Sequence, residues 1–145
     1  MENPTTDFAN ATQLAGSMVF SQLPEDCRLA RSAGVNLLIV VPEKANGFAD
    51  LLMPELATPV VAWRPGDRLM LPQPAQTGTL LLHNVGALSL LDQRYLVEWL
   101  ERAAGRTQVV STTPTALLPL VQAGTFLARL YYRLNTVCVD LNVTA

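Results

Sequence analysis

His83 and Asn84 are the residues whose type and position most strongly suggest chemistry. They directly follow the apolar run Thr79-Leu80-Leu81-Leu82, which is introduced by the turn residue Gly78. A continuous apolar run of this length predicts a strand that is buried on both faces, as in a parallel sheet. Polar residues just past such a strand lie at its carboxyl end, where open α/β sheets place their ligands. The sequence therefore predicts a ligand edge that carries an imidazole and a carboxamide.

His83 is the only histidine of the chain, so no cluster of histidine ligands can form around it. A catalytic triad of Ser111, His83 and a distant aspartate is arithmetically possible, but no nucleophile-elbow motif surrounds Ser111. We expect instead that the His83 side chain hydrogen-bonds neighbouring loops. An enzyme that uses His83 as a general acid or base stays an alternative.

The composition predicts one folded domain. The chain has 145 residues, half of them hydrophobic, with a net charge of −2, enough apolar surface for a buried core. No apolar run approaches the roughly 18 residues that cross a bilayer, and no signal peptide is evident, so we expect a cytoplasmic protein. The absence of a basic stripe argues against a nucleic-acid partner.

The chain has two cysteines, Cys27 and Cys138, which cannot form a disulfide framework. We expect Cys138 to be buried and inert.

Strands and helices are predicted to alternate, which implies an α/β domain with a mostly parallel five-stranded sheet. We expect residues 1–10 to be a flexible N-terminus and residues 11–145 to form a single domain. The predicted strands are Asn36–Val41, Thr58–Trp63, Thr79–Leu82, Thr107–Ser111 and Thr136–Leu141. The predicted helices are Ala11–Ala33, Phe48–Leu52, Ser89–Ala103, Thr115–Gln122 and Gly124–Leu134. The first is expected to be divided at Pro24, with Leu14, Met18 and Leu29 as core contacts, and Ser89 is expected to cap the third. Arg64–Thr77 is predicted to be mostly loop.

Three stretches in the second half of the chain together resemble the AAA+ ATPase domain of sigma-54-dependent transcription activators. GTLLLHNVG, from Gly78 to Gly86, is similar to the family's Walker B strand, usually GTLFLDEIG. VVSTT, from Val109 to Thr113, resembles the strand that ends in sensor I, usually VIAATN. AGTFLARLYYRLN, from Ala123 to Asn135, resembles AGRFREDLYYRLN. The resemblance implies a three-layer P-loop NTPase fold over roughly residues 78–141, with ATP and magnesium as the cofactors of the family.

The loop after the first predicted strand departs from the family's phosphate-binding loop. It reads Pro42-Glu43-Lys44-Ala45-Asn46-Gly47, and aligned on the strand, Asn46 and Gly47 fall where the family has Gly-Lys. Pro42 lacks an N–H donor, Glu43 adds negative charge, and Lys44 is out of register. The resemblance implies that any remnants of a nucleotide site would be Lys44, Asn46, Gly47, His83, Asn84 and Arg133.

The other motifs of the resembled ATPase are altered as well. His83 and Asn84 stand where the family has two acids, and an imidazole is a poor ligand for magnesium. Pro114 replaces the sensor I asparagine. Of the two arginine fingers, Arg133 matches the second, while Leu127 stands where the first should be; a finger is worth roughly a thousandfold or more in rate. We therefore predict no ATPase activity, no catalytic residue and no bound ATP or magnesium.

Arg133 and the aromatic residues near the motifs can be explained by packing and ion pairing as well as by function. We expect Arg133 to form an ion pair at the surface or at a helix end, the alternative being a surviving finger that acts on a neighbouring subunit. Tyr131 and Tyr132 are expected to pack, and Trp63 and Trp99 are expected to be core or half-buried anchors.

The resemblance also bears on partners. The family contacts sigma-54 through a GAFTGA loop, which Arg64–Thr77 does not contain, so we do not expect direct sigma-54 contact. The family continues into a helical lid after its fifth strand, whereas this sequence stops at Ala145; we expect a shortened relative or a piece of a longer protein.

The leading hypothesis is a non-catalytic regulatory or interaction module linked to transcription regulation, whose partner is an intact AAA+ activator or a second copy. No nucleic acid or membrane is expected to bind it. The alternatives are a sensor that binds ATP or ADP without hydrolysis, through Lys44, Gly47 and the ligand edge, and a fragment without a selected function.

Overall fold

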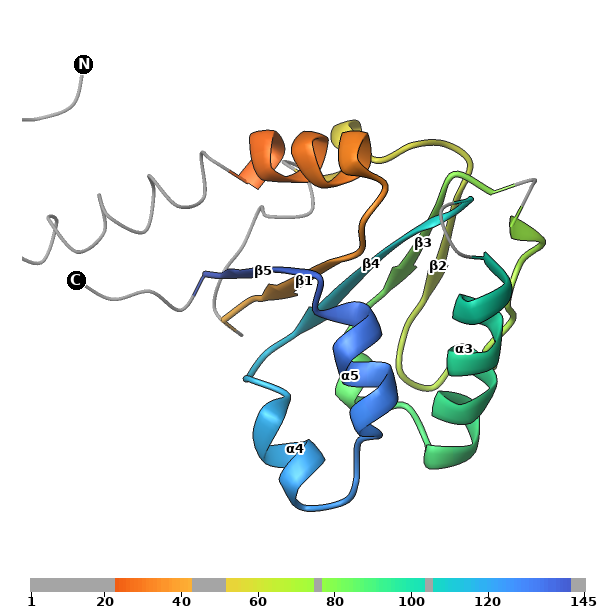
Figure 1. Ribbon diagram of the computed structural model, residues 1–145, viewed down its shortest axis with the longest axis vertical. Helices are drawn as coiled ribbons and strands as arrows, with labels where there is room; N and C mark the ends of the chain where they lie inside the picture. Colours follow the sequence, from red (N-terminus) through yellow and green to blue (C-terminus); the bar gives the residue numbers. More distant parts are fainter. Residues whose placement is uncertain (1–22, 43–51, 75–76, 104–105, 142–145) are drawn as a thin grey trace, which may run out of the picture.

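A five-stranded sheet with the strand order β2-β3-β4-β1-β5 lies at the centre of the structure (Figure 1). The structure is a computed structural model that describes residues 23–42, 52–74, 77–103 and 106–141. The strands are β1 (Leu37–Val40), β2 (Val60–Trp63), β3 (Thr79–Leu82), β4 (Gln108–Thr113) and β5 (Val137–Asp140). All four neighbouring pairs are parallel, which confirms the predicted sheet.

Helices cover both faces of this sheet, so the domain has three layers (Figure 1). Residues 23–33 are helical and lie on one face. The other helices are α3 (Leu90–Ala103), α4 (Leu118–Gln122) and α5 (Ala128–Leu134), with two short 3-10 turns, η1 (Met53–Glu55) and η3 (Val85–Ala87). Helices α3 and α5 lie on the second face, and α4 lies beyond the end of β4.

Two hydrophobic cores fill the spaces between the layers because successive strand residues point to opposite faces. In β1, Leu38 points into the core beneath α3 and α5, while Leu37 and Ile39 point into the core beneath residues 23–33. The first core includes Leu80, Leu82, Val109, Leu96, Trp99, Leu100, Phe126, Leu130 and Leu134. The second includes Leu81, Val110, Leu23, Cys27, Ala30, Leu52 and Leu56.

The three inner strands are buried along their whole length, whereas in β5, one of the two edge strands, burial alternates. Every residue of β1, β3 and β4 is buried, but in β5 half-buried and exposed residues alternate. Cys138 is consequently exposed, so the prediction of a buried thiol there was wrong: an edge strand leaves every second side chain in solvent. Cys27 is the buried thiol, and burial raises its pKa to about 11.

Most predicted elements form, with shifted ends. Strand β4 continues two residues beyond the predicted end, to Thr113. Helix α4 begins at Leu118 and is followed by Gly124, whose φ of 80° is the left-handed conformation that ends helices. Leu29 is 61% exposed and contributes to neither core, contrary to the prediction, because Cys27 and Ala30 occupy the inward face of its helix. The predictions for residues 1–22 and for the helix at 48–52 fall almost entirely outside the described residues.

Gly78 opens β3 because only glycine fits there. A Cβ atom built on Gly78 would lie 2.5 Å from the carbonyl oxygen of Ala57. The Thr79 hydroxyl donates a 2.8 Å hydrogen bond to the same oxygen. These contacts fix the start of the strand whose end carries His83 and Asn84.

The segment between β2 and β3 is anchored to the core by two buried tryptophans. The indole N–H of Trp63 donates to the carbonyl oxygen of Asp67 at 2.9 Å, and that of Trp99 donates to Pro72 at 2.7 Å. The Thr107 hydroxyl donates to the Pro74 oxygen at 2.8 Å. Both tryptophans are thus the anchors that the sequence predicts. Residues 64–74 form the expected loop and are bound along their length to the body of the domain.

The first turn of α3 is joined to the connection between α4 and α5 by one buried glutamine. Gln93 is completely buried. Its side-chain N–H groups donate to the carbonyl oxygens of Leu88 and Thr125, and its oxygen accepts from the Leu127 N–H at 2.8 Å. The predicted cap also forms, because the Asp92 N–H donates to the Ser89 hydroxyl at 3.1 Å. The start of α3 and the start of α5 therefore behave as one unit.

We predict that Gln93→Ala lowers the free energy of unfolding by about 2 to 4 kcal/mol, because it opens a cavity and leaves one buried and two partly buried backbone groups without their partner. Urea denaturation of the purified protein measures this loss. Gln122→Ala, at an exposed position of α4, is the control and should change stability by less than about 0.5 kcal/mol. Equal losses in the two variants would contradict the role assigned to Gln93.

Candidate functional site

The carboxyl ends of β1, β4 and β3 lie side by side at one edge of the sheet. Leu82 pairs with Ser111 and Val40 pairs with Thr113, so the residues after each strand emerge next to one another. His83 and Asn84 follow β3, Pro114 follows β4, and Val41 and Pro42 follow β1. This is the ligand edge that the sequence predicts. Lys44, Asn46 and Gly47 lie outside the described residues.

His83 carries a half-buried imidazole with an unusual environment. Its backbone N–H donates to the Trp63 carbonyl oxygen at 2.9 Å. Its side-chain Nε2 is buried and has no hydrogen-bond partner among the described residues. The predicted hydrogen bond from the imidazole to neighbouring loops is therefore not made by Nε2. Burial, and secondly the nearby Arg64, lower the pKa of His83 below its ordinary value, which favours the neutral ring at pH 7.

Asn84 forms the turn that leaves β3. Its backbone adopts the left-handed conformation (φ 49°, ψ 62°), which asparagine tolerates better than most residues. Its N–H donates to the Thr112 hydroxyl at 3.1 Å, and its carbonyl oxygen accepts from the Ala87 N–H at 3.0 Å. The carboxamide itself is exposed. A carboxamide can orient a water molecule but cannot take up its proton as a carboxylate does.

Ser111 cannot act as the nucleophile of a triad in this fold. Its side chain is completely buried in the middle of β4, and its hydroxyl has no hydrogen-bond partner among the described residues. A substrate would have to enter the sheet to reach it. Nor do the described residues contain a group of three or more His, Cys, Asp or Glu side chains that could hold a metal ion.

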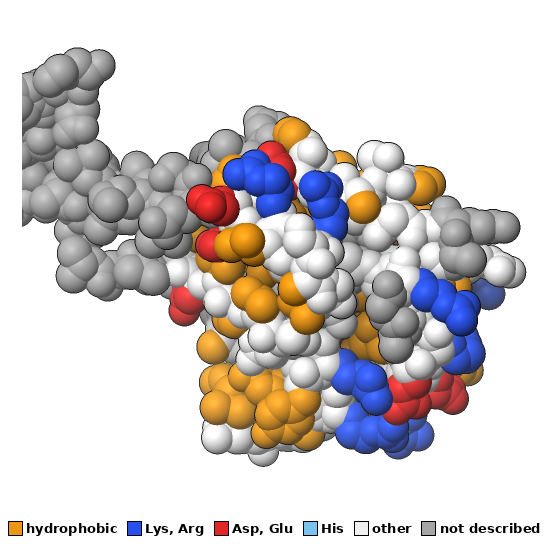
Figure 2. Space-filling model, turned by 45° about the horizontal axis from the view of Figure 1, so that its top comes forward, with side chains coloured by type: hydrophobic (Ala, Val, Ile, Leu, Met, Phe, Trp, Pro, Cys, Tyr) orange, Lys and Arg blue, Asp and Glu red, His pale blue; other side chains and the backbone are white. Residues whose placement is uncertain are grey.

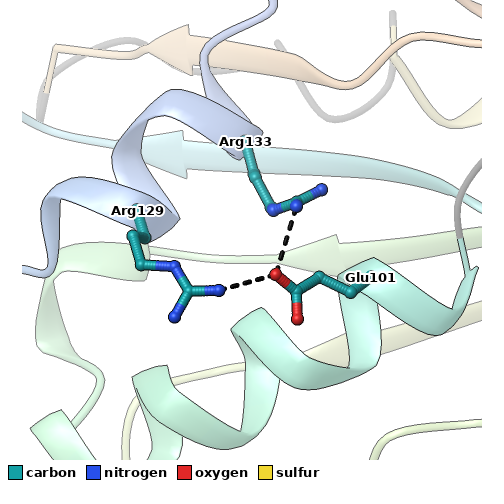
Figure 3. A network of polar contacts seen from close by, with 3 residues as sticks. All are labelled: Glu101, Arg129 and Arg133. Atoms are coloured by element: carbon teal, nitrogen blue, oxygen red, sulfur yellow. Dashed lines mark hydrogen bonds and ion pairs between the residues drawn. The ribbon is translucent and has the colours of Figure 1, made fainter.

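Arg133 lies at the opposite end of the sheet from His83 and Asn84. Its carbonyl oxygen accepts from the Asn36 side chain at 2.9 Å, just before β1 begins. Its guanidinium donates to the Glu101 carboxylate on α3 at 3.2 Å, beside Arg129 (Figure 3). The predicted ion pair is confirmed. The structure thus brings together His83 and Asn84 but does not bring Arg133 to them.

The two tyrosines of α5 differ in exposure. Tyr131 packs against the core beneath α3 and α5, as predicted. Tyr132 is 72% exposed, so its predicted packing role was wrong. The rings meet edge to face with their centroids 5.3 Å apart. Adjacent residues of a helix point about 100° apart, and only one of the pair can face the core.

Three polar contacts were not found from the sequence. Gln93 interrupts the apolar face of α3, a signal of a buried polar role. Thr112 lies next to Ser111 in a strand predicted to be buried, and a buried hydroxyl there is expected to hydrogen-bond a backbone group. Nothing in the sequence pairs Glu101 with Arg129, although Arg129 and Arg133 stand four residues apart on one helix face.

Among solved structures, those that resemble this chain include AAA+ P-loop NTPases. NtrX from Brucella abortus, crystallised with ATP, matches with a TM-score of 0.66 and 18% identity, covering 85% of this chain and 36% of that chain. RuvB from Thermotoga maritima, a K64R mutant, matches with a TM-score of 0.54 and 13% identity, covering 86% of this chain and 44% of that chain. The chain therefore has the AAA+ P-loop NTPase fold and spans little more than a third of the NtrX chain.

A family model described as the Sigma-54 interaction domain matches residues 67–143, more than half of the chain. The chain belongs to this family, which confirms the resemblance found in the sequence. A comparison with curated protein sequences found no match. Within the described part of the chain, none of the helices has both the length and the apolar character needed to span a membrane.

We predict that His83 makes stability depend on pH. Because its folded-state pKa lies below the ordinary value of about 6.5, the unfolded chain binds the proton first as the pH falls, and folding loses stability below that pH. Urea unfolding at pH 7.5 and 5.5 should show a larger loss for the natural protein than for His83→Gln. Since His83 is the only histidine, its imidazole NMR titration should give a pKa below 6.5; a value above 6.5 would contradict the burial described here.

Proposed function

We propose that this protein is a non-catalytic regulatory or interaction module of the sigma-54 interaction domain family, linked to transcription regulation. One observation carries the proposal: the strand that ends at the ligand edge delivers a neutral, partly buried His83 and an exposed Asn84. Neither side chain supplies the hard anionic oxygen that magnesium prefers.

The electrostatics of the edge support this proposal. Two adjacent carboxylates at a closed strand end repel each other and need a cation to offset their desolvation. A neutral imidazole and a carboxamide remove that requirement, so the fold no longer depends on nucleotide and magnesium. Such a replacement can stabilise a domain while it abolishes the reaction.

The segment between β2 and β3 supports an indirect role toward sigma-54. It has no GAFTGA motif, and Trp63, Trp99 and Thr107 hold it against the domain. The proposed partner is therefore a protein, an intact AAA+ activator or a second copy of this chain, and not sigma-54 itself. We further propose that residues 11–145 act as one degenerate AAA+ domain in the cytoplasm, preceded by a flexible N-terminus at 1–10, without nucleic acid or membrane.

The second candidate is a sensor that binds ATP or ADP without hydrolysing it. Its support is the shared fold with NtrX, which was crystallised with ATP and, in another structure with a TM-score of 0.67, with ADP. The residues that would contact phosphate are Lys44, Asn46 and Gly47, after β1, with His83, Asn84 and Arg133 as further remnants.

We predict no ATP hydrolysis and no thermal stabilisation by millimolar ATP with magnesium. A ligand at a hundred times its dissociation constant would add about 2.7 kcal/mol of stability, a shift that thermal unfolding detects easily. A shift that disappears in Lys44→Ala would establish the sensor in place of the proposed module. Hydrolysis above background, lost in His83→Ala with folding intact, would overturn the non-catalytic assignment.

We predict association with an intact sigma-54 activator from the same cell at micromolar concentrations. Oligomer surfaces involve many residues, so they can persist after a few catalytic side chains are replaced. Co-sedimentation of the purified proteins measures this association, and sedimentation of the chain alone measures self-association. If neither is detected at micromolar concentrations, the interaction role is contradicted.

A further inference from the structure

The charged cluster between α3 and α5 is electrostatically incomplete. Glu101 accepts hydrogen bonds from Arg129 at 2.6 Å and from Arg133 at 3.2 Å, and both end on the same carboxylate oxygen, Oε2 (Figure 3). One carboxylate thus serves two guanidinium groups, which leaves one positive charge over. The Arg129 side chain is 73% exposed, so most of its five N–H donors face solvent.

A second acid, Glu98, stands one turn before Glu101 on α3, but Arg94, Arg129 and Arg133 together still outnumber the two glutamates by one charge. Residues 102–139 contain four arginines, Arg102, Arg106, Arg129 and Arg133, and no Asp or Glu, although the whole chain has a net charge of −2. Figure 2 shows basic side chains around a smaller acidic area on the side of the molecule where α3 and α5 lie. On α3 and α5 together, four arginines therefore stand against three acids, a small excess of positive charge on this side of the molecule.

A groove of about 430 Å³ lies beside the cluster. Its apolar lining comes from Val97 on α3 and from Leu127 and Ala128 at the start of α5. Its charged lining is Arg94, Glu98, Glu101 and Arg129. The Leu127 N–H is bound to the buried Gln93, so the groove is held in shape by the core. Apolar side chains next to arginines are typical of protein docking surfaces, and here Glu98 and Glu101 stand among them.

We propose that this groove docks an acidic segment of a partner protein, in which carboxylates flank an apolar side chain. The apolar side chain lies over Val97 and Leu127, and a carboxylate pairs with Arg129 in competition with Glu101. A nucleic acid fits less well, because it has no aliphatic side chain to cover Val97 and Leu127, and its evenly spaced phosphates would meet Glu98 and Glu101 as well as the arginines. The inference rests on the proposed interaction role, since it names the chemistry of the partner.

Because Glu101 competes with the partner for Arg129, removing the Glu101 charge should strengthen binding of the partner. Glu101→Gln removes the internal competitor and raises the charge of the cluster, so it should tighten the binding of an acidic segment by about fivefold, the scale of one exposed ion pair. Arg129→Gln should weaken binding by about fivefold for the same reason. Arg68→Gln, an exposed arginine on the 64–74 loop, is the matched control and should have no effect.

The experiment uses the full chain and a fluorescein-labelled peptide of alternating Glu and Leu residues, with fluorescence anisotropy as the measurement. Binding should weaken between low salt and about 0.3 M NaCl, and the same peptide with Gln for every Glu should bind much more weakly. Melting curves of each variant check that it is folded.

Four results would overturn the inference: no binding of the acidic peptide at millimolar concentration, equal binding of the Gln peptide, weaker binding by folded Glu101→Gln, or equal effects of Arg129→Gln and Arg68→Gln. Loss of peptide binding with persisting activator association would overturn this groove alone. Peptide binding without any activator association would leave the groove standing and remove the proposed function.

Discussion

Strand β4 is the element on which the rest of the structure depends. Its six residues, Gln108–Thr113, are all buried and lie between β3 and β1, so each backbone polar group must be satisfied inside the sheet. Four of the six side chains are polar, which is unusual for a buried strand. Three of them bind backbone: Gln108 donates to Val35, Thr112 accepts from Asn84, and Thr113 donates to Thr115. The strand therefore sets the geometry of both ends of the sheet.

This arrangement explains why the ligand edge keeps its shape without charge. Asn84 is held by Thr112 in a left-handed turn, and His83 is held by the backbone of Trp63. Neither contact requires an acid, a cation or a nucleotide. The edge is thus stabilised by hydrogen bonds to its backbone and by burial.

Helices α3 and α5 are joined by two polar contacts with an apolar seam between them. The fully buried Gln93 connects the start of α3 to the start of α5 through partly buried hydrogen bonds. Glu101, about two turns further along α3, connects to Arg129 and Arg133 through exposed ion pairs. The buried contact carries most of the stability, because exposed ion pairs contribute little. In the proposal above, the exposed contact is the one that a partner replaces, while the buried contact nearby keeps the two helices together.

The sequence by itself determined the order of the elements, the parallel sheet, the edge at which His83 and Asn84 emerge, and the family. It did so because buried strands, turn glycines such as Gly78 and the LYYRL string are local signals that tertiary packing does not override. It did not determine that Cys138 is exposed, that Tyr132 points outward, or that Nε2 of His83 lacks a partner. Those facts depend on which strand is at the edge and which helix face meets the core. The pairing of Glu101 with Arg129 and Arg133 was likewise decided only by the tertiary structure, because residues 28 and 32 positions apart meet only once α5 packs against α3.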